Sequence, residues 1–163
     1  MDQYSRYSQN KNGEILLLSI VIPVFNSEQT IGPLVNQLIE MSASEDSEII
    51  IVDDASHDRS AEVCVELAER FSERVIFVQL SKNFGEHNAT MAGLAQTHGD
   101  YVLVMDDDFQ NPPQAVQYLL EEIRTGKFDV VYSRYEQKRH RKWRNIGSWV
   151  NNLVATFLLG KPY

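Results

Sequence analysis

VLVMDDDFQNPP, residues 102–113, is an apolar run that ends in three consecutive aspartates and a pair of prolines. A short apolar run bounded by turn-forming residues is typical of a buried β-strand. The sequence therefore predicts a strand that brings Asp106, Asp107 and Asp108 to its carboxyl end. Carboxylates this close repel one another in a partly dry cleft, so they require either full solvation or a bound cation.

The acidic turn has two interpretations. It is a solvated turn if Asp, Asn and Pro serve only as turn formers. It is a magnesium and diphosphate site if the carboxylates act together, because hard divalent ions prefer oxygen ligands and commonly take one or two carboxylates plus ligand phosphates. In extended backbone side chains alternate, so Asp106, Asp108 and Gln110 are expected to face the ligand. Asp107 would then face the other way.

The rest of the chain alternates apolar runs with segments of helical periodicity. Strands are predicted at residues 15–24, 48–52, 75–80, 102–105 and 130–132, and helices at about 31–39, 60–71, 86–97 and 112–123. The third helix carries Met91, Leu94 and Ala95 as its apolar side. Strands that are apolar on both faces and alternate with amphipathic helices predict an α/β fold, with a mostly parallel sheet covered by helices on both faces.

Polar residues follow each predicted strand. In chain order they are Asn26, then Asp53 and Asp54, then Lys82 and Asn83, then residues 106–110, and finally Arg134. In open parallel sheets, ligands bind outside the carboxyl ends of the strands. This coincidence favours a ligand site at the acidic turn over a solvated turn.

Composition limits the function classes. The chain has 163 residues, 43% hydrophobic content and a formal net charge of −8, which is typical of a soluble domain and argues against nucleic-acid binding. Its one cysteine, Cys64, excludes a disulfide framework and is expected in the core. No apolar run reaches the roughly 18 residues of a membrane span, so the chain itself is expected to be cytoplasmic.

The two ends differ from the middle. Residues 1–14 are polar and lack periodicity, so we expect a disordered leader before a domain at 15–137. Residues 138–144 hold five cationic side chains around Trp143, and an apolar helical stripe follows from Ile146 to Leu158. This pattern predicts a membrane-interfacial segment at 138–160 within a last region, 138–163. The alternative is that the stripe packs on the rest of a larger protein.

Four motifs together resemble the inverting family 2 glycosyltransferases, which have the Rossmann-like nucleotide-diphosphosugar transferase (GT-A) fold. They are SIVIPVFN at 19–26, IVDDAS at 51–56, NFG at 83–85 and MDDDFQNPP at 105–113. The last two and the late basic stretch are most similar to the polyprenyl-phosphate (dolichyl- or undecaprenyl-phosphate) sugar transferases. The resemblance implies transfer from a UDP- or GDP-sugar to a lipid phosphate at the cytoplasmic face of a membrane, in cell-wall or glycolipid biosynthesis.

The resemblance also implies residue roles. Asp106, Asp108 and Gln110 would hold Mg²⁺ or Mn²⁺ on the diphosphate, and Arg134 and Arg144 would bind phosphate groups. The donor nucleotide would contact residues at the ends of the first three strands or just after them: Pro23, Phe25, Glu28, Asp53, Asp54 and Lys82, with Asp106 beside them. Many relatives have Glu directly after the Asn of the first motif, whereas this chain has Ser27 and then Glu28.

Family members continue with acceptor segments and often with membrane helices. This chain stops at Tyr163, so it is expected to be a fragment of a longer protein, one that binds the donor without completing turnover. Self-association into a homo-oligomer is left open. Two other hypotheses remain: a noncatalytic sugar-nucleotide-binding or membrane-docking module, and an aspartyl-phosphate phosphotransferase, which also places Asp-x-Asp after a strand.

The acceptor decides whether a general base is needed. A lipid phosphate is already largely anionic at neutral pH and needs none, whereas an alcohol would need one, for which Asp107 or a residue beyond Tyr163 is a candidate. The four histidines, at positions 57, 87, 98 and 140, fall in separate segments and are expected to be structural or surface residues.

Overall fold

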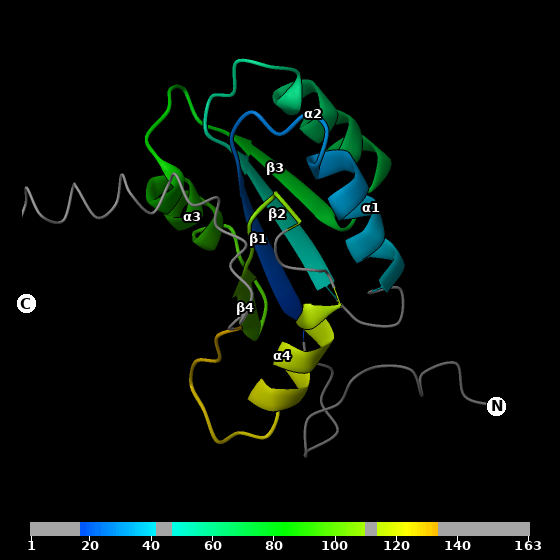
Figure 1. Ribbon diagram of the computed structural model, residues 1–163, viewed down its shortest axis with the longest axis vertical. Coiled ribbons are helices and arrows are strands. Elements are labelled where there is room, and N and C mark those ends of the chain that lie inside the picture. The colour runs from blue at the N-terminus through cyan, green and yellow to red at the C-terminus, as the bar shows by residue number, and fades with distance from the viewer. Residues whose placement is uncertain (1–16, 42–46, 110–113, 134–163) are drawn as a thin grey trace, which may run out of the picture. The chain divides into compact units, whose positions relative to one another are not determined.

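The computed structural model describes residues 17–41, 47–109 and 114–133. The chain divides into two units, residues 1–131 and 132–163, and every helix and strand described lies in the first (Figure 1). In chain order these elements are β1 (Leu18–Val24), α1 (Ile31–Met41), β2 (Ser47–Asp53), α2 (Ser60–Arg70), β3 (Val75–Gln79), α3 (Glu86–Leu94), β4 (Tyr101–Val104) and α4 (Ala115–Ile123).

The four strands form one parallel sheet in the order β3-β2-β1-β4. The chain moves outward from β1 to β3 and then returns to place β4 on the other side of β1. The strand order therefore reverses between β1 and β4, which is the switch point where open α/β sheets leave a crevice at their carboxyl ends. The predicted α/β class with a mostly parallel sheet is confirmed.

Side-chain alternation along the strands separates two cores. On one face Ile20 and Ile22 of β1 pack in a large cluster with residues of α1, α2 and α4. On the other face Val21 of β1 packs with Ile50 and Val52 of β2 against Ala89 of α3. Figure 1 shows α1 and α2 on the opposite side of the sheet from α3. These strands are hydrophobic throughout because helices cover both of their faces.

The predicted apolar side of α3 is wrong in part. Met91 is 64% exposed and Ala95 is exposed, whereas the buried residues of the helix are Ala89 and Gly93. A Cβ atom on Gly93 would lie only 2.5 Å from Cγ1 of Val21. The helix packs closely on the sheet through its small residues, so Met91 points away from the sheet, while Leu94 is half-buried against the same cluster. Periodicity of large residues alone could not reveal such a contact face.

Gly93→Ala is therefore expected to destabilise the protein by about 1–3 kcal/mol, because the added methyl group overpacks the contact with Val21 and Val52. Gly32→Ala is the matched control, since its Cβ would lie 3.5 Å from Val63, an ordinary contact. Alanine is the better helix former by about 1 kcal/mol, so the control should be neutral or stabilising. Urea unfolding of both variants checks this, and equal stabilities would contradict the close packing.

Two further expectations about the sheet are wrong. Val102 and Val104 of β4 are 43% and 46% exposed, because α3 packs on β1 and β2 rather than on β4. The predicted fifth strand at 130–132 is absent from the described residues, where these positions have no strand pairing and Val130 is 60% exposed. Three apolar residues are fewer than the five or six of a typical strand, so pairing is weakly specified there.

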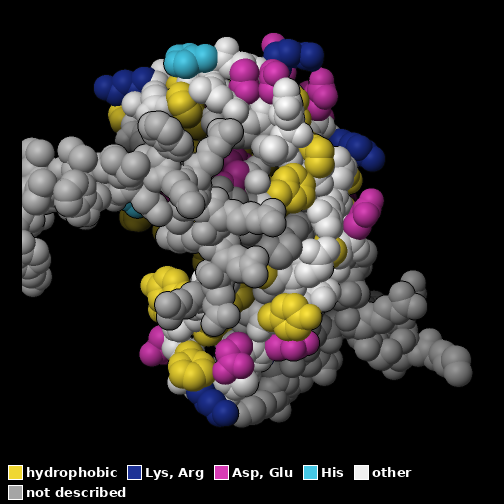
Figure 2. Space-filling view, in the orientation of Figure 1, with side chains coloured by type: hydrophobic (Ala, Val, Ile, Leu, Met, Phe, Trp, Pro, Cys, Tyr) yellow, Lys and Arg dark blue, Asp and Glu magenta, His cyan; other side chains and the backbone are white. Residues whose placement is uncertain are grey.

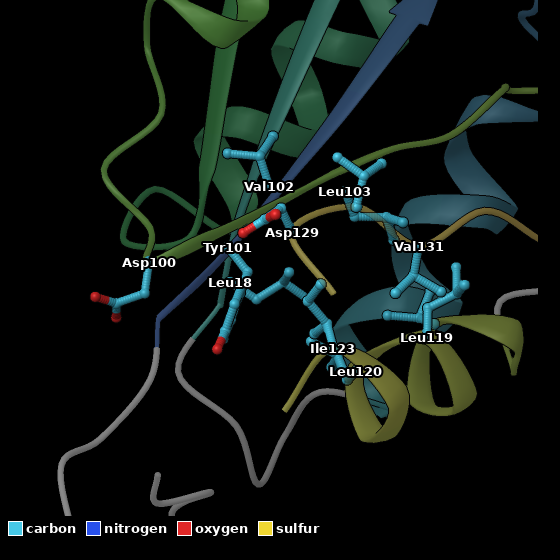
Figure 3. A pocket seen from close by; sticks show the side chains of 12 residues that line it. Leu18, Asp100, Tyr101, Val102, Leu103, Leu119, Leu120, Ile123, Asp129 and Val131 are labelled. Atoms are coloured by element: carbon cyan, nitrogen blue, oxygen red, sulfur yellow. The ribbon is translucent and has the colours of Figure 1, made fainter. Parts of the chain in front are cut away.

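A pocket of about 320 Å³ lies between β4 and α4 (Figure 3). It is lined mainly by apolar side chains of β4, α4 and residues 129–131, with Leu18 and Tyr101 at the start of β1 and β4. The pocket is therefore at the amino ends of the strands, opposite the acidic turn.

In the part of the chain that the structure describes, no helix is long and apolar enough to cross a membrane.

Cys64 confirms the prediction of a core thiol. It is fully buried on the inner face of α2, in the cluster that also holds Leu67. Burial raises the pKa of the Cys64 thiol to about 12, and the negative charge of Asp53 adds to the effect. The thiol is therefore protonated at physiological pH and is a packing residue.

Candidate functional site

The acidic turn follows β4 at the switch point of the sheet, next to the loop that follows β1. Met105 is buried, and its N–H donates to the carbonyl of Val21 (3.1 Å), so the turn begins at a fixed place beside β1. Strand geometry ends at Val104, and Phe109 has a left-handed backbone with φ 57°, which is typical of a sharp turn. The three aspartates lie between these two points.

Asp107 points into the protein. Its Oδ2 accepts a hydrogen bond from the hydroxyl of Ser27, and its carboxylate also accepts one from the N–H of Phe25. Burial raises the pKa of Asp107, although both hydrogen bonds oppose that rise. This carboxylate is held by the β1 loop and is a poor candidate for a general base that must reach an acceptor.

Asp106 and Asp108 are exposed on either side of it. Nearby protein atoms partly desolvate the Asp106 carboxyl group and so raise its pKa, and the negative charges of Asp108, Glu86 and Asp107, in that order, raise it further. Glu86 is the first residue of α3, so two loops contribute carboxylates to this electronegative corner. A cation would relieve the repulsion among them.

Asp106 and Asp108 have the chemistry of ligands for a divalent cation. Asp106 and Asp108 supply hard carboxylate oxygens, and a site with two carboxylates completed by ligand phosphates suits Mg²⁺ or Mn²⁺. Within the described residues, no three His, Cys, Asp or Glu side chains converge as a complete metal-binding group. Asp106 and Asp108 would therefore be two of the ligands of such an ion, with further ligands needed to complete its coordination.

Asp54 organises the loop that follows β3. It is 2% exposed, and its two carboxylate oxygens each accept a hydrogen bond of 2.8 Å, from the N–H of Phe84 and from the N–H of Gly85. Gly85 adopts φ 90° and ψ 152°, a conformation that essentially only glycine tolerates. Asp53 is fully buried, and its carboxylate accepts from the N–H of Ser56. Both aspartates shape loops at the site.

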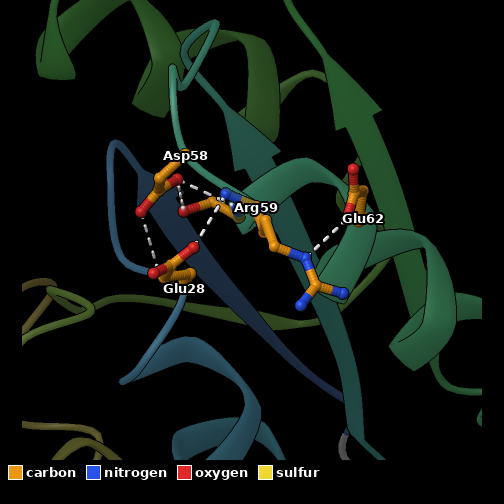
Figure 4. A network of polar contacts seen from close by, with 5 residues as sticks. Glu28, Asp58, Arg59 and Glu62 are labelled. Atoms are coloured by element: carbon orange, nitrogen blue, oxygen red, sulfur yellow. Dashed lines mark hydrogen bonds and ion pairs between the residues drawn. The ribbon is translucent and has the colours of Figure 1, made fainter.

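Reciprocal hydrogen bonds join the loops that follow β1 and β2 (Figure 4). The N–H of Glu28 donates to Asp58 Oδ2 (3.2 Å), and Glu28 Oε2 accepts from the N–H of Arg59 (3.0 Å). Arg59 Nε also pairs with Glu62 at 2.8 Å. Glu28 is thus occupied in tying two loops together.

Aromatic and basic groups lie on the same edge of the sheet. Phe25 is 42% exposed just beyond β1, and its ring makes an edge-to-face contact with His57, with centroids 5.9 Å apart. Lys82 places its Nζ 5.0 Å from the ring centroid of Phe84. Pro23 is buried within β1. Phe25 and Lys82 are therefore accessible to a ligand, whereas Pro23 supports the strand.

The structure brings together Asp53, Asp54, Phe25, Glu28 and the acidic turn, all beside the carboxyl ends of β1, β2 and β4. Gln110, Arg134, Arg144 and the basic segment 138–144 lie outside the described residues. Reasoning from the sequence missed Ser27, Ser60 and Glu86. The sequence shows a polar residue in each loop that follows a strand, but it does not show which of these residues contact one another.

Surface charge agrees with the composition. On the face shown in Figure 2, acidic side chains lie at both the upper and the lower end, and basic side chains are scattered singly. A nucleic-acid interface requires clustered cations, which this view of the described residues does not show.

This sheet order, with acidic and aromatic groups at the carboxyl ends of the strands, defines an open α/β protein, a class whose ligands bind at the switch point. The chain belongs to glycosyl transferase family 2, whose sequence pattern matches residues 19–160. The resemblance inferred from the four motifs is thereby confirmed.

Two curated relatives are undecaprenyl-phosphate 4-deoxy-4-formamido-L-arabinose transferases. The protein from Photorhabdus laumondii is 33% identical over 150 residues, covering 91% of this chain and 46% of the relative. The one from Pseudomonas paraeruginosa is 40% identical over 141 residues, covering 85% of this chain and 41% of the relative. The chain therefore spans a little under half the length of these relatives.

Solved structures support the fold. Glucosyl-3-phosphoglycerate synthase from Mycobacterium tuberculosis, in complex with Mn²⁺, UDP-glucose and phosphoglyceric acid, matches with a TM-score of 0.62 and 24% identity. The match covers 88% of this chain and 50% of that one. Mannosyl-3-phosphoglycerate synthase from Rubrobacter xylanophilus matches with a TM-score of 0.61 and 21% identity, over 85% and 47% of the two chains. The predicted GT-A fold is confirmed.

Proposed function

We propose that this chain forms the donor-binding part of an inverting glycosyltransferase, which moves a sugar from a UDP- or GDP-sugar to a polyprenyl phosphate. The observation that carries the proposal is the acidic turn at the β1–β4 switch point, where Asp106 and Asp108 are exposed while Asp107 is held inward. Family membership favours this over an aspartyl-phosphate phosphotransferase. The names of the relatives support a polyprenyl-phosphate acceptor.

The residues of the site would have separate roles in binding the metal ion, the base and the phosphate groups. Asp106 and Asp108, with Gln110, would hold Mg²⁺ or Mn²⁺, which when bound offsets charge on the leaving diphosphate. Phe25 offers an exposed ring to the base, and Asp54 fixes the loop that carries Lys82 and Phe84. Arg134 and Arg144 would hold phosphate oxygens, since guanidinium groups suit bidentate contacts.

The charge of the acceptor determines whether the reaction needs a general base. A lipid phosphate is largely ionised at neutral pH, so it can attack without a general base, which agrees with the inward position of Asp107. The basic run at 138–144 would attract anionic lipid and keep the site at the cytoplasmic face of the membrane. The membrane role of 138–160 belongs to this proposal.

Thermal unfolding with UDP, GDP and their sugar conjugates, each with and without Mn²⁺, tests the proposal. A ligand at about one hundred times its Kd stabilises by roughly 2.7 kcal/mol, which shifts the midpoint measurably. We expect a metal-dependent shift with one of the two nucleotides. A shift without transfer of labelled sugar to undecaprenyl phosphate by the longer protein would favour a noncatalytic binding module, and no shift for either protein would contradict donor binding.

A further inference from the structure

A hydrogen bond between Ser27 and Asp107 connects two loops of the site, and these two residues are 80 positions apart in the sequence. The hydroxyl of Ser27, just after β1, donates to Oδ2 of Asp107, in the acidic turn after β4. The N–H of Phe25 donates to the same carboxylate. The central aspartate of the turn is thus held from the β1 loop by one side chain and one backbone group.

Ser27 is itself held firmly. Its N–H donates to Oγ of Ser60 (2.7 Å), and Ser60 is fully buried at the start of α2. The hydroxyl of Ser60 in turn donates to Asp58 Oδ1. The carbonyl of Ser27 accepts from the N–H of Ile31 (3.0 Å) as α1 begins. The hydroxyl that meets Asp107 is therefore anchored to α1 and α2.

The acidic turn has a different kind of support. Met105 fixes its start beside β1, and the left-handed backbone of Phe109 closes it. Between these points Asp107 points inward, and Asp106 and Asp108 are exposed. Residues 106–109 lie beyond the strand, in a turn, and the hydrogen bonds from Ser27 and Phe25 hold Asp107 at the centre of that turn. Asp106 and Asp108 are its direct neighbours along the backbone. The contact with Ser27 therefore bears on where both exposed carboxylates point.

We propose that Ser27 is a positioning residue for the metal and diphosphate site: by holding Asp107 inward, its hydroxyl presents Asp106 and Asp108 together to the ligand. This inference rests on the proposed function and deepens it. It also assigns Asp107 a structural role, with no contact to donor or acceptor. A site whose ligands are held by supporting hydrogen bonds typically loses 10–100-fold in metal affinity when that support is removed.

The test compares Ser27→Ala with Ser27→Thr, which keeps the hydroxyl. Ser56→Ala is the matched control. It also removes a hydroxyl that binds the loop after β1, where the Ser56 hydroxyl accepts from the N–H of Asn26 (2.9 Å). The measured quantity is the Mn²⁺ affinity in the presence of UDP or GDP, determined by isothermal titration calorimetry. We expect Ser27→Ala to weaken it by roughly tenfold and Ser27→Thr and Ser56→Ala to stay within about twofold of the unaltered chain.

An unchanged affinity in Ser27→Ala would overturn the inference, and so would a tighter one, because a released Asp107 would then act as a ligand. Ser27→Glu should weaken binding further, since it sets a second carboxylate against Asp107. Absence of Mn²⁺ binding by the unaltered chain would instead count against the proposed function.

A second measurement needs no metal. Urea unfolding of Ser27→Ala, Asp107→Asn and the double variant gives the coupling between the two side chains. Non-additive destabilisation is expected if the hydrogen bond holds the turn. Strictly additive effects would overturn the inference, whatever the result with Mn²⁺.

Discussion

Asp108→Asn should weaken the metal-dependent binding of a nucleoside diphosphate by roughly 100-fold or more, about 2.7 kcal/mol, and Asp106→Asn should do the same. Each substitution replaces a charged oxygen ligand with a neutral amide at a site where two carboxylates share one ion. Binding measured without metal should change little. Calorimetric titration of the nucleotide with and without Mn²⁺ gives both values for each variant.

Stability separates this effect from misfolding. Desolvation raises the pKa of Asp106, and the negative charges of Asp108 and Glu86 raise it further, so removing the charge of Asp106 relieves desolvation and repulsion in the absence of metal. The melting temperature of Asp106→Asn should therefore stay equal or rise at neutral pH. Asp129→Asn, an exposed aspartate at the opposite end of the sheet, is the control and should bind as the unaltered chain does. An equal loss of metal-dependent nucleotide binding in Asp106→Asn, Asp108→Asn and Asp129→Asn would contradict the assignment of Asp106 and Asp108 as metal ligands.

Asp54→Ala is expected to lower the stability by about 2–3 kcal/mol, because the N–H groups of Phe84 and Gly85 both lose their acceptor. For a chain of this size that is a fall of roughly 5–10 °C in the melting temperature. Hydrogen exchange of these two amides should accelerate as the loop loosens. Donor binding should weaken as well, since the loop carries Lys82.

Asp58→Ala provides a comparison within the same set of loops. It removes hydrogen bonds to Ser60 and Glu28 but leaves the acceptor of the Phe84 and Gly85 amides in place. Those amides should keep their protection in Asp58→Ala. If Asp54→Ala melts at the temperature of the unaltered chain and keeps the same amide protection, Asp54 does not organise this loop.

The sequence was most informative where burial is strong. β1 and β2 are buried along almost their whole length, so their apolar runs predict them directly, and the helical spacing of Leu34, Val35 and Leu38 predicts α1. The strand-end rule then places Asp54 and the acidic turn at one edge. These features follow from hydrophobic periodicity and from the geometry of parallel sheets.

What the sequence could not predict depends on contacts between distant segments. The close packing of Gly93 on Val21 is invisible to a search for large apolar residues. The sequence predicts that Asp107 faces away from Asp106 and Asp108, but it does not show that Ser27, 80 positions away, holds Asp107 there. The exposed face of β4 at Val102 arises because α3 lies over β1 and β2. Each of these is a tertiary effect that local pattern does not encode.

Electron paramagnetic resonance of free Mn²⁺, titrated with the chain in the presence of UDP or GDP, tests directly whether the acidic turn binds a nucleoside diphosphate through a divalent ion. We expect the free Mn²⁺ signal to fall with the unaltered chain only when a nucleotide is present, and to persist with Asp108→Asn. If the unaltered chain leaves the signal unchanged, or if both chains reduce it equally, the acidic turn is not the site of this ion.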